Sequence, residues 1–162
     1  MRHSKKSRSV YQDSRSRINN IQKSFSLTDA ELTEIMMVSP QTTSNWVHGY
    51  SHTGRSMRIH RQRIDLLERA SRNPYEHAVI ATALSQGGVG GLSALLMYCI
   101  SGGTSLEKAV NTRQFMWVRY YLAKDFRNNV QAGFSPDKAY KMTSCQMAIA
   151  RLENSKKRYG RK

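Results

Sequence analysis

The sequence predicts an all-α fold with two domains, an N-terminal one of four or five helices and a C-terminal helical one. Apolar residues recur at spacings of three and four along most of the chain. No segment alternates apolar and polar residues for long enough to predict a strand. A chain of 162 residues is also long enough to close two small cores.

The first helix is expected to begin near Arg15. Residues 1–14 have almost no apolar content, which predicts a disordered basic arm. Beyond the arm, Ile18, Ile21 and Phe25 are spaced so that they share one face of a helix.

Two further helices are marked by their start signals. Thr28 and Glu31 form a capping box, in which each side chain satisfies a backbone N–H at the helix start. Ser39 followed by Pro40 predicts a third helix, because Ser caps well and Pro at the first position loses no hydrogen bond. Gly49 is expected to end that helix. The second helix has a short apolar stripe made of Leu32, Ile35 and Met36.

A fourth helix is expected from about Met57 to Ala70, with Ile59, Ile64, Leu66 and Leu67 as its buried residues. Asn73-Pro74 then predicts a break, since Pro lacks the backbone donor and disfavours helix in the residue before it. We place the domain boundary there, so that the first domain covers residues 15–73.

The second domain is expected to cover residues 74–156 and to be followed by a basic tail, residues 157–162. Glycines separate its apolar segments and so set the expected helix limits. The pattern predicts helices over Ala78–Leu84, Leu92–Ile100 and Ser105–Ala132, a turn at Gly87–Gly91, and a last helix from Pro136 to about Lys156.

The charge is strongly basic, with 26 Lys and Arg against 11 Asp and Glu and a formal net charge of +15. Residues 1–23 carry seven Lys or Arg, residues 24–54 carry none, and residues 55–72 carry six Arg. A soluble protein this basic usually meets a polyanion, and nucleic acid is the leading candidate. Residues 24–54 also carry three acids, so a nearly neutral segment lies between two basic ones. This is typical of a base-reading element flanked by phosphate contacts, although two solvated basic tails would give the same pattern.

Cysteine use and hydropathy favour a cytoplasmic protein. Cys99 and Cys145 are far apart, which predicts neither a disulfide framework nor a zinc ribbon. The basic N-terminus is not followed by the apolar stretch of a signal peptide. The longest nearly apolar run, Val89 to Ile100, is about half of the ~20 residues that cross a bilayer, so we expect no membrane span.

The segment from Thr28 to Gly49 combines a short capped helix, a tight turn and a second helix that closes with Trp46 and Val47. Together with the apolar residues of the first helix, it resembles the lambda-repressor-like (Xre-type) helix-turn-helix domain over about residues 15–70. In that family's pattern the apolar positions that join the two helices fall on Leu32, Met36, Val38 and Trp46.

The sequence differs from the family pattern at four positions. The family usually has Ala at the position of Thr33, Gly at the turn position of Met37 and Val or Ile at the position of Thr43. Members often offer a Gln to a phosphate where this chain has Asp29. The turn position matters most, because Gly adopts a positive φ that Met adopts only at a cost.

The resemblance implies that the third helix enters the DNA major groove. Gln41 and Asn45 are the best candidates for reading bases, because an amide can form two hydrogen bonds with an adenine edge. By the same correspondence, the helix also presents Pro40, Thr42, Ser44 and His48. Ordinary solvent-facing roles remain the alternative for each of these residues.

Contacts with the DNA backbone are expected from Ser39 and from basic residues on both sides of the recognition helix. The candidates are Arg15, Arg17, Lys23, Arg55, Arg58 and Arg61. In the N-terminal arm, a minor-groove or phosphate contact is expected from Arg2, Lys5, Lys6 and Arg8.

Aromatic and basic residues interleave between Arg113 and Lys124, where the chain carries Phe115, Trp117, Val118, Tyr120, Tyr121 and Leu122. Such a stretch is typical either of a core with a dimer interface or of a stacking surface for single-stranded nucleic acid. We favour the first interpretation, with the C-terminal helices joining two copies or binding another protein.

Enzymatic and metal-binding functions have little support. The GGVGG stretch lacks the preceding strand and the third glycine of a dinucleotide loop. The Ser105–Lys108 and Ser135–Lys138 spacings match Ser/Lys hydrolases, but both serines stand at expected helix starts. His48 and His52 have no second ligand pair nearby. We therefore expect no enzyme, no metal and no cofactor.

The sequence favours a sequence-specific regulator of transcription that binds double-stranded DNA as a homodimer in the cytoplasm of a bacterial or phage-infected cell, at the nucleoid. Two alternatives stay open in the same DNA-binding class. One is a structural accessory of a relaxosome, partition, packaging or replication complex, and the other is an antitoxin that represses its own gene. An RNA-binding protein drawn in by charge alone is a third alternative.

Overall fold

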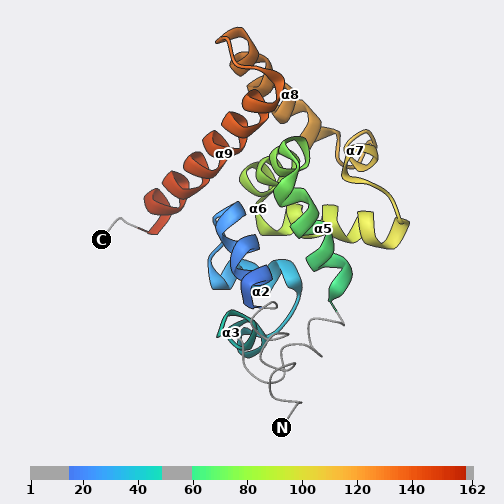
Figure 1. Cartoon of the computed structure of the whole chain (residues 1–162), viewed down its shortest axis with the longest axis vertical. Helices are drawn as coiled ribbons and strands as arrows, with labels where there is room; N and C mark the ends of the chain where they lie inside the picture. The colour runs from blue at the N-terminus through green and yellow to red at the C-terminus, as the bar shows by residue number, and fades with distance from the viewer. Residues whose placement is uncertain (1–14, 49–59, 160–162) are drawn as a thin grey trace, which may run out of the picture. The chain divides into compact units, whose positions relative to one another are not determined.

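The computed structural model describes residues 15–48 and 60–159, with side chains up to Asn154, and is all-helical over these residues (Figure 1). The chain divides into two compact units, Met1–Arg69 and Ala70–Lys162. The division falls within one helix, close to the Asn73-Pro74 step. The expected all-α fold class is confirmed for the part of the chain that is described.

Unit 1 contains a helix over residues 15–25, α2 (Asp29–Met36), α3 (Pro40–His48) and the first part of α5 (Arg61–Arg72). The helix starts near Thr28 and Ser39 are as expected, and α5 covers the described part of the fourth expected helix. The expected core residue Ile59 lies outside the described residues. The core of unit 1 is formed by Ile18, Ile21, Phe25, Leu27, Leu32, Ile35, Met36, Trp46, Ile64, Leu66 and Leu67.

Unit 2 contains α6 (Pro74–Gly102), α7 (Leu106–Ala109), α8 (Met116–Gln131) and α9 (Pro136–Tyr159). Helix α6 packs against α7, α8 and α9, and α8 also packs against α9. The α8–α9 contact includes a buried polar cluster, in which Asn129 Nδ2 donates to Thr143 Oγ1 at 2.9 Å and to Gln146 Oε1 at 3.1 Å. These bonds satisfy the polar atoms that the contact removes from water.

Helix α6 is longer than the sequence indicates. Asn73 caps it by accepting from the Glu76 N–H at 3.0 Å, so it begins at Pro74 instead of Ala78. The expected turn over Gly87–Gly91 is reduced to one residue, Gly88, with φ 68° and ψ −170°. A glycine adopts this backbone without the clash that a Cβ would cause, so the helix changes direction and then continues.

By length and composition alone, α6 is apolar enough to cross a membrane. Half of its most apolar window is buried inside the protein, and Gly88 interrupts it. The core helix of a globular unit gives the same pattern. We therefore assign α6 to the core of unit 2.

The single long helix expected over Ser105–Ala132 is wrong, because α7 ends at Ala109 and α8 begins at Met116. Side chains that follow α7 bond back to its carbonyl groups. Asn111 Nδ2 donates to the Glu107 carbonyl at 3.0 Å, and Thr112 Oγ1 donates to the Ala109 carbonyl at 2.6 Å. Such bonds compete with the helical pattern and favour a turn.

Gly87 and Gly91 lie one helical turn apart and leave space for the Trp117 ring of α8. A Cβ added to Gly87 would stand 2.4 Å from Trp117 Cη2, and one added to Gly91 would stand 3.2 Å from it. By contrast, a Cβ on Gly90 would meet no atom within 4 Å. The glycines therefore allow close packing of α6 on α8, which sequence analysis did not foresee.

We predict that Gly87→Ala destabilises the protein by about 1–3 kcal/mol, because the added methyl group overpacks the contact with Trp117. Gly90→Ala is the matched control. It should leave stability unchanged or raise it by up to about 1 kcal/mol, since Ala favours helix over Gly. Urea unfolding followed by circular dichroism measures both, and equal stabilities of the two variants would contradict the close packing.

Candidate nucleic-acid interface

The candidate site is built on α2, α3 and the turn between them. At the start of α2, Thr28 Oγ1 accepts from the Glu31 N–H at 3.1 Å while Glu31 Oε1 accepts from the Thr28 N–H at 3.0 Å. At the start of α3, Ser39 Oγ accepts from the Thr42 N–H at 3.1 Å. Both helix starts are thus fixed by side chains adjacent in sequence, as expected.

Met37 closes α2 in the left-handed conformation, with φ 57° and ψ 48°. Its N–H donates to the Glu34 carbonyl at 3.2 Å, and the Val38 N–H donates to the Thr33 carbonyl at 3.1 Å. These two bonds form a Schellman motif, which usually places Gly at the left-handed position. The turn therefore keeps the shape that glycine favours, although a non-glycine residue there costs about 1–2 kcal/mol.

Arg63 of α5 supplies the end of α2 with the cation that α2 itself lacks in its last turn. Its Nη1 donates to the Ile35 carbonyl at 3.1 Å, and its Nη2 lies 3.3 Å from Met37 Sδ. A guanidinium at a helix C-terminus satisfies a free carbonyl and interacts favourably with the helix dipole. The role of Arg63 cannot be predicted from the sequence, because its contact joins residues far apart in the chain.

Thr33 and Thr43, two positions at which the sequence differs from the lambda-repressor-like pattern, contact each other. Their hydroxyl oxygens lie 2.7 Å apart in a hydrogen bond between α2 and α3, and Thr43 is 1% exposed. Thr33 Oγ1 also lies 2.7 Å from the Asp29 carbonyl, and Thr43 Oγ1 lies 3.5 Å from the Ser39 carbonyl. The contact between the two helices at this point is therefore a hydrogen-bonded polar pair.

The other family difference, Asp29, is held by a neutral neighbour. Gln22 Nε2 donates to Asp29 Oδ1 at 2.7 Å and lies 3.5 Å from the Leu27 carbonyl. Gln22 belongs to the helix over residues 15–25, so this hydrogen bond ties the Asp29 carboxylate to that helix.

One face of α3 carries most of the expected base-reading residues. The buried Thr43 and Trp46 define its inner side. On the outer side, four polar residues fall within about 100° of one another at 3.6 residues per turn. They are Gln41, Ser44, Asn45 and His48.

Gln41 and Asn45 are joined on this face, since Gln41 Nε2 donates to Asn45 Oδ1 at 3.0 Å. Thr42 lies nearer the buried side, and its Oγ1 is 3.0 Å from Ser39 Oγ. Pro40 and Ser39 are exposed at the helix start. The structure therefore brings the two amides together and gives Thr42 a capping contact instead of a place beside them.

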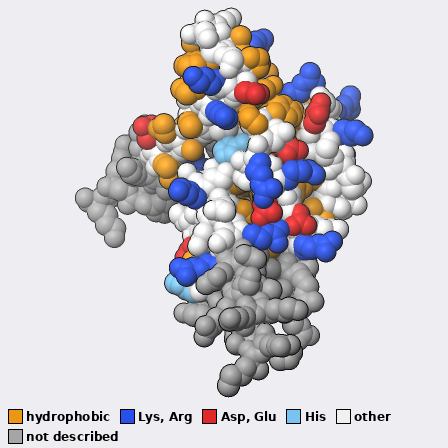
Figure 2. All heavy atoms as spheres, viewed as in Figure 1, with side chains coloured by type: hydrophobic (Ala, Val, Ile, Leu, Met, Phe, Trp, Pro, Cys, Tyr) orange, Lys and Arg blue, Asp and Glu red, His pale blue; other side chains and the backbone are white. Residues whose placement is uncertain are grey.

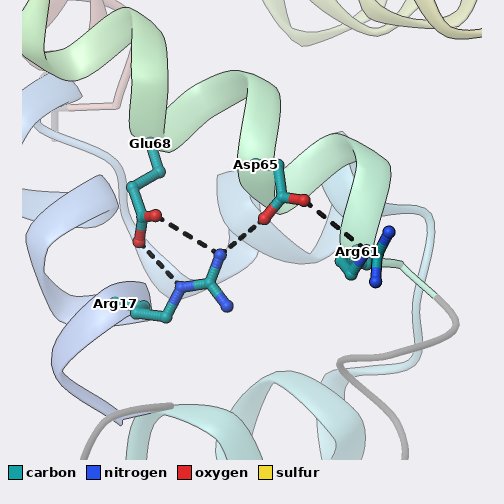
Figure 3. Close-up of polar contacts among 4 residues, drawn as sticks. All are labelled: Arg17, Arg61, Asp65 and Glu68. Carbon is teal, nitrogen blue, oxygen red and sulfur yellow. Dashed lines mark hydrogen bonds and ion pairs between the residues drawn. The ribbon is translucent and has the colours of Figure 1, made fainter.

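Arg17, expected to contact DNA phosphates, forms ion pairs within the fold (Figure 3). Its Nε donates to Glu68 Oε2 at 2.8 Å and its Nη2 to Asp65 Oδ1 at 2.6 Å, while Arg61 Nε lies 3.6 Å from Asp65 Oδ2. The hydrogen bond with Glu68 raises the pKa of Arg17. These ion pairs join the helix over residues 15–25 to α5, so we treat Arg17 as a residue of the fold.

The other residues that were expected to contact the DNA backbone divide into two groups. Arg15, Lys23 and Arg61 are exposed on unit 1. The others lie outside the described residues, namely Arg2, Lys5, Lys6, Arg8, Arg55 and Arg58. Among the described side chains, no group of three or more His, Cys, Asp or Glu is arranged to hold a metal ion.

His60 packs against the buried Trp46 in a T-shaped contact, with ring centroids 5.7 Å apart. Burial lowers the pKa of His60 below its ordinary value of 6.5, and the nearby charge of Arg63 lowers it further. The folded protein therefore favours the neutral form of the His60 imidazole over the protonated form.

No protein-family model, no curated protein and no solved structure matches this chain. The resemblance to the lambda-repressor-like domain therefore stays a prediction from the sequence.

We predict that Thr43→Val lowers the free energy of unfolding by about 0.5–1.5 kcal/mol, because it removes the hydrogen bond between the Thr33 and Thr43 hydroxyl groups. The double variant Thr33→Ala/Thr43→Val should recover most of this loss, since both polar groups are removed together. Urea unfolding of the wild type, the two single variants and the double variant gives the coupling energy. Strictly additive effects would show that the hydrogen bond contributes nothing.

We also predict that unit 1 loses stability as the pH falls below about 6.5. A histidine whose pKa is lowered on folding binds its proton more tightly in the unfolded chain, so acid favours unfolding. The stability difference between the wild type and His60→Phe, measured by urea unfolding from pH 7.5 to 5, isolates this contribution from that of the carboxylates. A difference that does not change with pH would refute it.

Proposed function

We propose that this chain is a sequence-specific double-stranded DNA-binding protein that regulates transcription, with α3 as the recognition helix. The observation that supports it best is the polar face of Gln41, Ser44, Asn45 and His48 on a short helix fixed by its neighbours. Such a helix has the diameter to enter a major groove about 12 Å wide. Helix α3 contains no acidic residue that phosphates would repel.

The paired amides suit base recognition. A side-chain amide donates and accepts, and so matches the N6 and N7 atoms of adenine. The bond between Gln41 and Asn45 limits the rotamers of both residues before DNA binds, which reduces the entropy lost on complex formation. We assign base reading to Gln41 and Asn45 first, and to Ser44 and His48 next.

Phosphate contacts are assigned to Arg15, Lys23 and Arg61, and to the basic residues of the N-terminal arm and of residues 55–58. The formal net charge of +15 supports them, because neutralised phosphates supply much of the affinity of such proteins. A homodimer in the bacterial or phage-infected cytoplasm completes the proposal, since two copies would read two half-sites about one helical turn apart.

A structural accessory of a DNA-processing complex is the second candidate function. Unit 2 favours it, because the unit carries exposed cationic side chains of its own, including Arg113, Lys124 and Arg127. A dimerisation domain alone has no need of them.

We expect selection from a random duplex pool, at about physiological salt, to recover a sequence motif, because base readout persists where purely ionic binding fades. Gln41→Ala or Asn45→Ala should then cost about 1–3 kcal/mol on that site and little on unrelated DNA. Gln62→Ala, which removes an exposed amide from α5, is the matched control and should bind like the wild type.

Arg58→Ala should weaken binding to all duplexes alike and lower the dependence of log K on log salt by about one unit. The absence of any motif, with binding that vanishes as salt rises, would refute the proposed sequence-specific function. Loss of specificity in Gln62→Ala instead of Gln41→Ala would refute the placement of the recognition helix.

A further inference from the structure

Helix α8 presents a mixed aromatic and cationic face to solvent. Its inner side is fixed by the buried Val118, Leu122 and Asn129. Away from them, Met116, Tyr120, Lys124 and Arg127 fall within about 80° of one another at 3.6 residues per turn. Met116 is 51% and Tyr120 64% exposed, so two large side chains lie open to solvent on the same side of α8.

The cations of this face, which we call the α8 face, have no partner within the described part of the chain. Neither Lys124 nor Arg127 forms an ion pair or a hydrogen bond there. The one acidic residue of α8, Asp125, is half-buried on another side of the helix. The ring of Tyr120 forms a T-shaped contact with that of Tyr121, with centroids 5.3 Å apart and an interplanar angle of 81°. The α8 face is therefore both positively charged and open.

We propose that the α8 face binds an unpaired nucleic-acid strand. Lys124 and Arg127 would contact phosphates, while Tyr120 and Met116 would pack against exposed bases. Stacking on aromatic side chains along a cationic surface is how single strands are held without sequence preference. A duplex keeps its bases stacked inside, and so offers phosphates but no base faces to Tyr120.

A second copy of this chain fits the α8 face less well than a polyanion does. In a two-fold contact centred on this face, the surface meets itself, so Lys124 and Arg127 would approach the same cations of the other copy. The face has no acidic residue to pair with them. Figure 2 shows lysine and arginine side chains among exposed hydrophobic ones over the end of unit 2 formed by α8 and α9.

The rest of the interleaved stretch serves the fold. Phe115, Val118 and Leu122 are buried, and Trp117 packs against Gly87 and Gly91 of α6. Of the interleaved aromatic and basic stretch, the part available for stacking is therefore Tyr120 and its neighbours on the α8 face. This inference does not depend on α3 and holds whether or not α3 reads duplex DNA.

The test is the anisotropy of a fluorescent 15-nucleotide oligothymidylate, which cannot base-pair with itself, titrated with the full-length protein at several salt concentrations. Tyr120→Ala should weaken binding about tenfold, whereas Tyr120→Phe, which keeps the ring, should bind like the wild type. Lys124→Ala/Arg127→Ala should reduce the slope of log K against log salt by about 1.4, since each phosphate contact with a single strand contributes about 0.7.

The matched control is Lys138→Ala/Lys141→Ala, which removes the same charge from the exposed surface of α9. It should leave the slope unchanged, and an equal reduction would refute a localised site. Circular dichroism of each variant verifies folding, and Gln41→Ala should bind the oligonucleotide normally, which separates this test from that of the proposed function.

Three further results would overturn the inference. The first is no binding of oligothymidylate by the wild type, which would point to a protein partner for the α8 face. The second is equal weakening of random duplex DNA by Tyr120→Ala. The third is a change of sedimentation coefficient in Tyr120→Ala, which would assign the face to contact between copies.

Discussion

The orientation of α3 depends on how the last turn of α2 is closed. Met37 adopts a left-handed backbone that costs about 1–2 kcal/mol for a residue with a Cβ. The closure is fixed by two backbone hydrogen bonds of the Schellman motif and by Arg63, which donates to the Ile35 carbonyl from α5. Burial of Trp46 beyond the turn offsets the strain, because burying a large aromatic side chain contributes more than the turn costs. The turn geometry is therefore determined by tertiary packing and not by the preference of its residue.

The features that could be predicted from the sequence are local ones. Thr28–Glu31 and Ser39–Pro40 fix helix starts through atoms at most three residues apart, so their patterns were sufficient. Arg63 could not be found in this way, because its partner is 28 residues away and an arginine on an amphipathic helix has many possible roles. The Thr33–Thr43 bond spans ten residues, and in the sequence each of these residues is only a departure from a family pattern.

Unit 2 shows a second limit of reasoning from composition. Glycines between Gln86 and Leu92 predict a turn, yet only Gly88 leaves the helical conformation, while Gly87 and Gly91 make room for Trp117. Glycine is required in both cases because a Cβ is excluded, either by the backbone or by a neighbouring ring. The sequence contains no signal that separates the two reasons. The early end of α7 was missed for a similar reason, since Asn and Thr occur within helices as well as at their ends.

Formal charge does not reveal which cations are free to bind a partner. Arg17 and Arg63 belong to unit 1 of a chain with a net charge of +15, yet ion pairs and a helix end occupy their guanidinium groups. Lys124 and Arg127 belong to the same excess but remain open beside Tyr120. The two proposed surfaces also differ in chemistry, since α3 offers neutral amides and α8 offers cations and a ring. Amides discriminate base edges, whereas cations and rings add affinity with little sequence preference. A chain with both proposed surfaces would read a duplex site and also hold an unpaired strand, a combination that suits the second candidate function, an accessory of a DNA-processing complex.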